Sequence, residues 1–229
     1  MRTKTLVAAV TVLLLSSALA ACGSGGGGGG TPPQTSVKLA QTGQTVCYDA
    51  AGAVVACANT GQDGNKLAGV AWPNPRFTNP DGTAPVTGSV VVDQLTGLMW
   101  LKDANCISTN YASFDNDGTP GDGRVTWQHA LDFVAGINAG TYSLCGGGHT
   151  DWRLPNRKEL RSLANYGQAN TVTWLNTQGF GNVRANYYWS STTDAATIAR
   201  AVDVPMYDGS VTAYSKTGDD YVWPVRSGQ

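Results

Sequence analysis

The sequence is poor in charged residues and contains no cluster of positive ones. Charged side chains make up 14% of the 229 residues, against about 25% in typical soluble domains, and the formal net charge is −1. Proteins that bind nucleic acid neutralise its phosphates with grouped lysines and arginines. Because no such group occurs here, the composition excludes nucleic acid as a partner.

Residue patterns that carry catalysis are also scarce. The chain has two histidines, His129 and His149, and no Gly-x-Ser-x-Gly motif. His129 lies beside the apolar face of a predicted helix and His149 in a glycine-rich loop, so surface roles suit them better than the role of a catalytic base. We predict that the protein is not an enzyme. Carboxylate pairs that converge only in the fold leave open an enzyme that acts on glycan.

The longest apolar run lies at the start of the chain, at residues 6–15. Arg2 and Lys4 precede it and small residues follow it, which is the order of a secretory signal. The run is too short to cross a bilayer, which takes about 20 apolar residues. The sequence therefore predicts an exported protein.

The segment Leu19-Ala20-Ala21-Cys22 resembles a bacterial lipobox. The resemblance implies that residues 1–21 are a lipoprotein signal peptide and that lipid on Cys22 anchors the protein to a membrane of the cell envelope. The next residue is Gly23 and not Asp, which resembles signals that send lipoproteins to the outer membrane, at its periplasmic face or the cell surface. An ordinary secretory signal with a chance cysteine is the alternative. Residues 22–40, rich in Gly, Pro and Ser, are predicted to form a flexible tether.

Four cysteines follow Cys22, and an even number in an exported protein predicts two disulfides with three possible pairings. We favour Cys47–Cys57, which flank a turn, and Cys106–Cys145, which would enclose a predicted helix. Closing the second loop would contribute about 3–4 kcal/mol. Free buried thiols are the alternative, and no Cys-x-x-Cys motif supports a zinc site.

The residue pattern predicts an α+β fold, with mostly antiparallel strands, two helices and long loops. Alternating and β-branched runs predict strands: 45–48, 54–57, 90–93, 98–101, 187–189, 199–204, 210–214 and 221–225. The first helix is predicted over 126–138, where apolar residues share one face: Trp127, Ala130, Leu131, Val134 and Ile137. The second is predicted over 157–166, with Asn156 and Glu159 as a capping box.

Five sequence blocks occur in order between residues 93 and 226. They are 93–100, 127–131, Asp151-Trp152-Arg153-Leu154-Pro155 with Glu159, 188–192 and 224–226. Together they resemble the Lcl C-terminal domain family, a family of unknown function, over 85–229. We predict that the residues that carry these blocks are structural: Trp100, Trp127, Asp151, Trp152, Arg153, Leu154, Pro155, Glu159, Trp189 and Arg226.

The resemblance implies a C-type lectin-like fold whose first and last strands pair. The family is named after a collagen-like bacterial adhesin whose terminal domain binds host polysaccharide. Fold relatives that generate formylglycine use a late cysteine pair, but no cysteine follows Cys145. Upstream, residues 41–84 are predicted to form a disulfide-stapled hairpin and a turn-rich segment.

The loop at 115–123 concentrates oxygen ligands. Asp115, Asp117 and Asp122 resemble the carboxylate shells that Ca²⁺ prefers, although the EF-hand spacing is absent. A solvated loop is the alternative. Lectins of this fold that bind sugar through calcium use Glu-Pro-Asn or Gln-Pro-Asp, and neither occurs. We therefore predict no cofactor, with calcium at this loop as a subordinate possibility.

The stretch 194–220 is the predicted recognition surface, because tyrosines and short polar side chains make adaptable contacts. Its candidate ligand-binding residues are Tyr207, Asp208, Tyr214, Lys216, Asp219 and Asp220. In fold relatives diversified by retroelements the variable residues lie in this region, so a diversified ligand-binding protein is one interpretation.

These observations predict a non-enzymatic, lipid-anchored envelope protein that binds a glycan or protein ligand for adhesion or recognition. Two alternatives remain open: an envelope enzyme that acts on glycan, and a structural or assembly lipoprotein. The sequence leaves the oligomeric state open.

Overall fold

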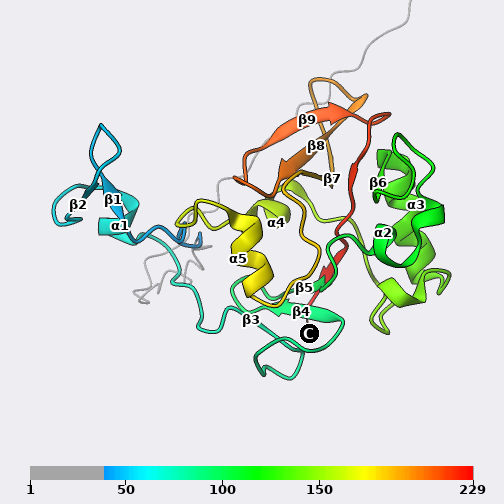
Figure 1. Cartoon of the computed structure of the whole chain (residues 1–229), viewed down its shortest axis with the longest axis horizontal. Coiled ribbons are helices and arrows are strands. Elements are labelled where there is room, and N and C mark those ends of the chain that lie inside the picture. The colour runs from blue at the N-terminus through cyan, green and yellow to red at the C-terminus, as the bar shows by residue number, and fades with distance from the viewer. Residues whose placement is uncertain (1–38, 229) are drawn as a thin grey trace, which may run out of the picture. The chain divides into compact units, whose positions relative to one another are not determined.

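A computed structural model of the protein describes residues 39–228 (Figure 1). The predicted signal peptide, Cys22 and most of the predicted tether at 22–40 lie outside the described residues. Among residues 39–228, no helix combines the length and apolar character needed to cross a bilayer.

The first described element is a small hairpin of β1 (Cys47–Tyr48) and β2 (Val54–Val55), which pair antiparallel. The Asp49 carboxylate closes its turn by accepting the backbone N–H groups of residues 51 and 53, at 2.9 and 2.8 Å. Helix α1 (Asp63–Lys66) follows. Just before it, the Gln62 side chain bonds to the backbone of Tyr48. The predicted Cys47–Cys57 disulfide is confirmed.

A four-stranded antiparallel sheet has the order β11-β5-β4-β3. Its strands are β3 (Phe77–Thr78), β4 (Val90–Asp93), β5 (Leu98–Leu101) and β11 (Val225–Ser227). The β4–β5 turn ends at Gly97, whose φ of 69° suits glycine. The last strand of the chain thus pairs with β5 of the β4–β5 hairpin, and β3, from the turn-rich segment, extends the same sheet.

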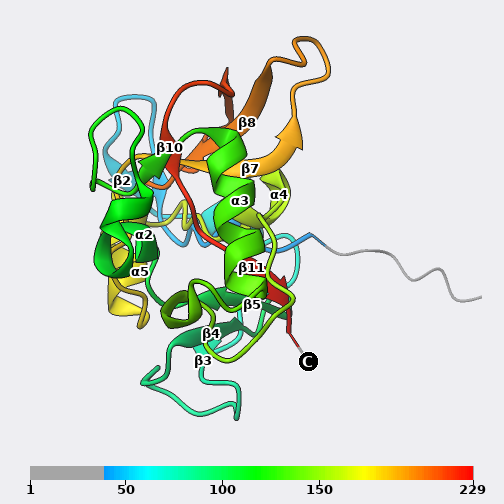
Figure 2. The same cartoon turned by 90° about the vertical axis from the view of Figure 1, so that its right-hand side faces the viewer.

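A five-stranded sheet has the order β6-β10-β7-β8-β9. Its strands are β6 (Arg124–Val125), β7 (Tyr187–Thr193), β8 (Arg200–Pro205), β9 (Thr212–Ser215) and β10 (Asp220–Tyr221). Only the β10–β7 pair among these is parallel. The chain between β10 and β11 runs from this sheet to the other (Figures 1 and 2).

Four further helices pack around the sheets: α2 (Cys106–Asn110), α3 (Trp127–Asn138), α4 (Arg157–Ser162) and α5 (Thr171–Thr177). Short 3-10 helices η1 (Ala112–Phe114) and η2 (Ser143–Cys145) flank α3. The predicted Cys106–Cys145 disulfide is confirmed and joins α2 to η2. In Figure 1, α3 lies on the opposite side of the domain from α5.

The core is rich in aromatic side chains, and two of its three fully buried tryptophans bond to backbone carbonyls, whereas Nε1 of Trp100 has no partner among the described residues. Trp100, Trp189 and Trp223 are fully buried. Indole Nε1 of Trp189 donates to the Val125 carbonyl at 2.7 Å, and Nε1 of Trp223 donates to the Leu101 carbonyl at 2.8 Å. These bonds tie the core to both sheets, because Val125 belongs to β6 and Leu101 to β5.

The α+β fold is confirmed, with two corrections to the predicted helices. The described residues contain five helices where two were predicted. The helix predicted over 157–166 ends at Ser162, because the N–H of Tyr166 donates to the Thr42 carbonyl at 3.0 Å and draws the chain out of the helical path. The helix predicted over 126–138 is α3, and Phe133 joins its buried face.

Candidate ligand-binding site

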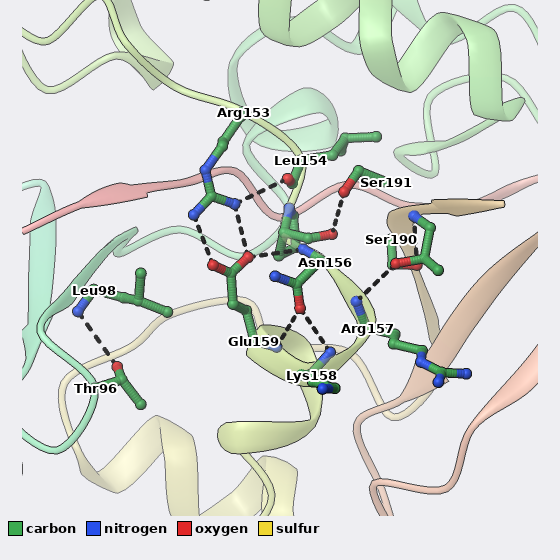
Figure 3. A network of polar contacts seen from close by, with 12 residues as sticks. Thr96, Leu98, Arg153, Leu154, Asn156, Arg157, Lys158, Glu159, Ser190 and Ser191 are labelled. Carbon is green, nitrogen blue, oxygen red and sulfur yellow. Dashed lines mark hydrogen bonds and ion pairs between the residues drawn. The ribbon is translucent and has the colours of Figure 1, made fainter. Parts of the chain in front are cut away.

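The 151–159 block forms a polar network at the start of α4 (Figure 3). The Arg153 guanidinium donates to both carboxylate oxygens of Glu159, each at 2.7 Å. Glu159 also accepts the Asn156 N–H at 2.8 Å while the Asn156 side chain caps the helix, so the predicted capping box is present. Burial opposes the Glu159 charge, but the bonds from Arg153 and Asn156 together hold the pKa of this carboxyl below its ordinary value.

The same block is tied to the last strand. Asp151 accepts two bonds from the Arg226 guanidinium of β11, at 2.6 and 3.1 Å. The Arg226 bond lowers the pKa of Asp151. The backbone of Trp152 bonds to the Asn138 side chain at the end of α3, at 2.8 Å in both directions. Because its polar groups bind one another, this block holds α3, α4 and β11 together and offers little to a ligand.

The carboxylates of the acidic loop at 115–123 accept hydrogen bonds from residues of the loop and its surroundings. Asp115 is 1% exposed and accepts the Gly123 N–H at 2.8 Å; burial raises its pKa. Asp117 accepts from His129 Nδ1 at 2.6 Å, and Asp122 accepts from Arg124 Nε at 2.9 Å. Among residues 39–228 no three Asp, Glu, His or Cys side chains converge as a metal site. The three acids proposed as calcium ligands thus have separate partners.

The strongest candidate site is an open pocket of about 420 Å³ on the five-stranded sheet. Every strand of that sheet contributes to its lining, which includes Arg124, Tyr187, Asp203, Tyr214, Asp219 and Asp220. The strand order explains the convergence, because β10 inserts between β6 and β7 and brings residues 219–220 beside residue 187.

Two buried carboxyl groups form the floor of this pocket. Asp203 is 3% exposed and Asp220 is 4% exposed. Asp203 accepts a hydrogen bond from the Thr212 hydroxyl. With both carboxylates ionised, Oδ2 of Asp220 has no donor within reach among the described residues. A proton held on Asp220 and shared with Asp203 would give the carboxyl a hydrogen-bond partner. Burial, followed by the charge and hydrogen bond of Asp203, raises the pKa of Asp220 to about 8.

The pocket's remaining charges come from Asp219 and Arg124. Burial, followed by repulsion from Asp117, raises the pKa of Asp219. Arg124 lies within the pocket lining, but its Nε and NH2 groups bond to Asp122 at 2.9 and 2.8 Å. That bond raises the pKa of Arg124. Arg124 is therefore already neutralised by an acid outside the lining.

Tyrosine side chains form the rim. Tyr214 is 48% exposed, stacks at 6.1 Å on Trp189, and packs over Gly218, where an added Cβ would lie 2.1 Å from its ring. The Tyr187 hydroxyl lies 3.3 Å from that of Tyr207. The rim thus presents aromatic surface beside a polar floor.

The six predicted ligand-binding residues divide between the pocket and its surroundings. Tyr214, Asp219 and Asp220 line the pocket, and Tyr207 contacts a lining residue. Asp208 lies outside it and accepts the Ser210 N–H at 2.9 Å. The Lys216 amine also lies outside it, 2.9 Å from the Thr193 hydroxyl and 4.1 Å from the centre of the Trp127 ring.

Sequence reasoning did not single out several lining residues: Arg124, Asn186 and Tyr187, which lie outside the predicted stretch 194–220, and Asp203 and Thr212, which lie within it. A signal for Asp203 existed. It is the single acid within the run Ala201-Val202-Asp203-Val204, and a charged residue on a buried strand needs a partner or a function.

The fold and pocket define an α+β domain that carries a partly exposed acidic and aromatic pocket on one sheet. The chain belongs to the Lcl C-terminal domain family, whose model matches residues 89–226, more than half of the sequence. No curated protein matches the chain.

Proposed function

We propose that the protein is a non-enzymatic, lipid-anchored envelope protein whose C-type lectin-like domain binds a glycan. The pocket on the five-stranded sheet carries this proposal, because it combines what sugars require. Sugar rings have apolar C–H faces that pack on tyrosine rings, and hydroxyl groups that bond to carboxylates and amides. Tyr187 and Tyr214 supply the aromatic rings, and Asn186 and the aspartates supply the amide and carboxylate groups.

The geometry of Asp203 and Asp220 supports recognition over glycan hydrolysis. Glycosidases hold two carboxyl groups about 5–9.5 Å apart, with the scissile bond between them. The hydrogen bond that Asp203 makes with Asp220 places these two carboxyls closer together than a glycosidase pair. A structural or assembly role draws less support. Exposed apolar side chains such as Val54, Leu144 and Ile198 lie apart along the chain, on β2, on η2 and in the β7–β8 loop respectively.

A glycan array with the full-length chain tests binding at the pocket. Tyr214→Ala removes a rim surface, and we expect it to weaken binding to any array ligand by about tenfold or more. Tyr48→Ala is the matched control, because Tyr48 is 46% exposed and lies on β1, outside the pocket. Equal binding by both variants, or no binding by the wild type to any glycan, would contradict the proposal. Thermal melts establish that both variants fold.

Cys22→Ser tests the anchor. We expect wild type to sediment with membranes, because several acyl chains anchor stably, and the variant to be released. Membrane fractionation and immunoblotting make the comparison. Retention of the variant at the wild-type level would disprove lipid attachment at this cysteine.

A further inference from the structure

The pocket carries more negative than positive charge. Asp203, Asp219 and Asp220 line it, whereas Arg124 is the single cation in its lining and is bonded to Asp122. Even with one proton shared between Asp203 and Asp220, negative groups remain in excess. An anionic ligand such as a sulfated or uronic sugar would meet repulsion here, and a cationic ligand would meet attraction.

A buried oxygen in this pocket lacks a permanent donor. Oδ2 of Asp220 is unpartnered in the ionised state, and the residue is 4% exposed at the pocket floor. A buried polar atom without a partner costs free energy, which a ligand can recover by donating a hydrogen bond. An ammonium group supplies both the N–H donors and the charge, and it would replace the shared proton.

The walls of the pocket also suit a cation. The ring faces of Tyr187 and Tyr214 carry negative electrostatic potential, which attracts an ammonium group held close to them. The Lys216 amine does not compete, because it lies outside the lining, against Trp127 and Thr193. The charged groups that line or adjoin the pocket come from the strands and the acidic loop: Asp117, Asp122, Arg124, Asp203, Asp219 and Asp220.

We propose that the pocket binds an amino sugar whose amine is free and protonated, with the ammonium group donating hydrogen bonds to Asp220 and Asp203 and the sugar ring against Tyr214. This inference rests on the proposed glycan binding and names its ligand class. It assigns Asp220 the central role, because this residue has the unpartnered oxygen.

Two oligosaccharides that differ in the amine alone provide the test. Chitosan tetramer carries free amines, and chitin tetramer has the same backbone with each amine acetylated. Isothermal titration calorimetry of the full-length chain in detergent micelles would give both affinities. We expect chitosan tetramer to bind about 10- to 100-fold more tightly, as for hydrogen bonds to charged groups.

Variants separate a built site from general charge attraction. Asp220→Asn and Asp203→Asn keep side-chain shape, and each is expected to reduce the preference for chitosan at least fivefold. Asp208→Asn is the matched control, because Asp208 lies nearby but outside the lining. It is expected to keep the preference. Near-UV circular dichroism reports whether each variant folds. If a variant does not fold, the affinities of the wild-type protein for the two oligosaccharides still test the proposal.

The possible failures are distinguishable. Equal binding of chitin and chitosan, lost in Tyr214→Ala, would overturn the amine assignment and leave glycan binding standing. Chitosan binding that Asp220→Asn does not change would also overturn it. Binding of an oligolysine peptide in an Asp220-dependent way, with neither sugar bound, would replace the amino sugar by a cationic peptide. Failure to bind these sugars or any arrayed glycan would overturn both proposals.

Discussion

Replacing Arg76 with methionine is expected to lower the free energy of unfolding by about 3–5 kcal/mol. Arg76 is 3% exposed, and its Nε and NH2 groups donate to the two oxygens of the fully buried Asp93, at 2.9 and 2.8 Å. NH2 also donates to the Ser162 carbonyl at 2.7 Å. The substitution would leave the Asp93 charge buried with only the weaker donors of its own turn, Leu95 N–H and the Thr96 hydroxyl.

The substitution should weaken the contacts that hold separate elements of the domain together. Arg76 precedes β3, Asp93 ends β4, and Ser162 ends α4, so one guanidinium connects three elements. It also packs over the rings of Trp72 and Phe77, at 4.4 and 4.7 Å from their centres. Methionine retains part of that packing, which makes the lost ion pair the main effect.

Urea unfolding gives the free energies. Arg157→Met, at an exposed position of α4, is the control and is expected to change stability by less than about 0.5 kcal/mol. The double variant Arg76→Met/Asp93→Asn should recover part of the loss, because the buried charge is then gone. A loss below about 1 kcal/mol in Arg76→Met, or no recovery in the double variant, would show that the pair does not stabilise the fold as described.

The second large effect is a pH dependence that Asp220 imposes on stability. An unfolded aspartate titrates near pH 3.9, on the order of four units below the folded pKa of Asp220, which burial and Asp203 raise to about 8. Between these values the folded protein binds a proton that the unfolded chain has released. The contribution of Asp220 to stability is therefore greatest at low pH and is lost as pH rises toward 8.

Asp220→Asn removes this term, since an amide does not titrate. Between pH 5 and 8 we expect wild type to lose about 2–4 kcal/mol more than Asp220→Asn, from a slope of at most about 1.4 kcal/mol per pH unit. The raised pKa of Asp219 adds the same trend to both proteins and cancels in the comparison. Urea unfolding at several pH values measures it, with Asp208→Asn expected to follow wild type. If the free energy of unfolding changes equally with pH in wild type and Asp220→Asn, the folded protein does not hold a proton at Asp203 and Asp220.

Local patterns in the sequence predicted the parts of the fold that depend on neighbouring residues. The capping box of Asn156 and Glu159 lies within one helical turn and the apolar face of α3 recurs every three or four residues, and both are present. Helix α5 was missed because its sequence begins Thr171-Val172-Thr173, and β-branched residues favour strands. It forms because Val172 and Leu175 are buried and the Asn170 side chain caps Thr173.

The site was less predictable because its residues meet through long-range pairing. Tyr214, Asp219 and Asp220 were foreseen from a run of aromatic and polar side chains. Their partner Asp203 lies on β8, separated from β10 by β7. A single strand's composition does not reveal that β10 runs parallel to β7, and this pairing decides which acids share a pocket.

The central claim is that the pocket on the five-stranded sheet binds a glycan. The most direct measurement is the change in backbone amide NMR shifts of the ¹⁵N-labelled full-length chain as the strongest array ligand is added. The largest changes are predicted at 186–187, 203, 212–214 and 219–220, the segments that line the pocket. The largest changes elsewhere, for example at Lys102, Asp103 and Asn110 around the second disulfide, or no changes at all, would contradict it.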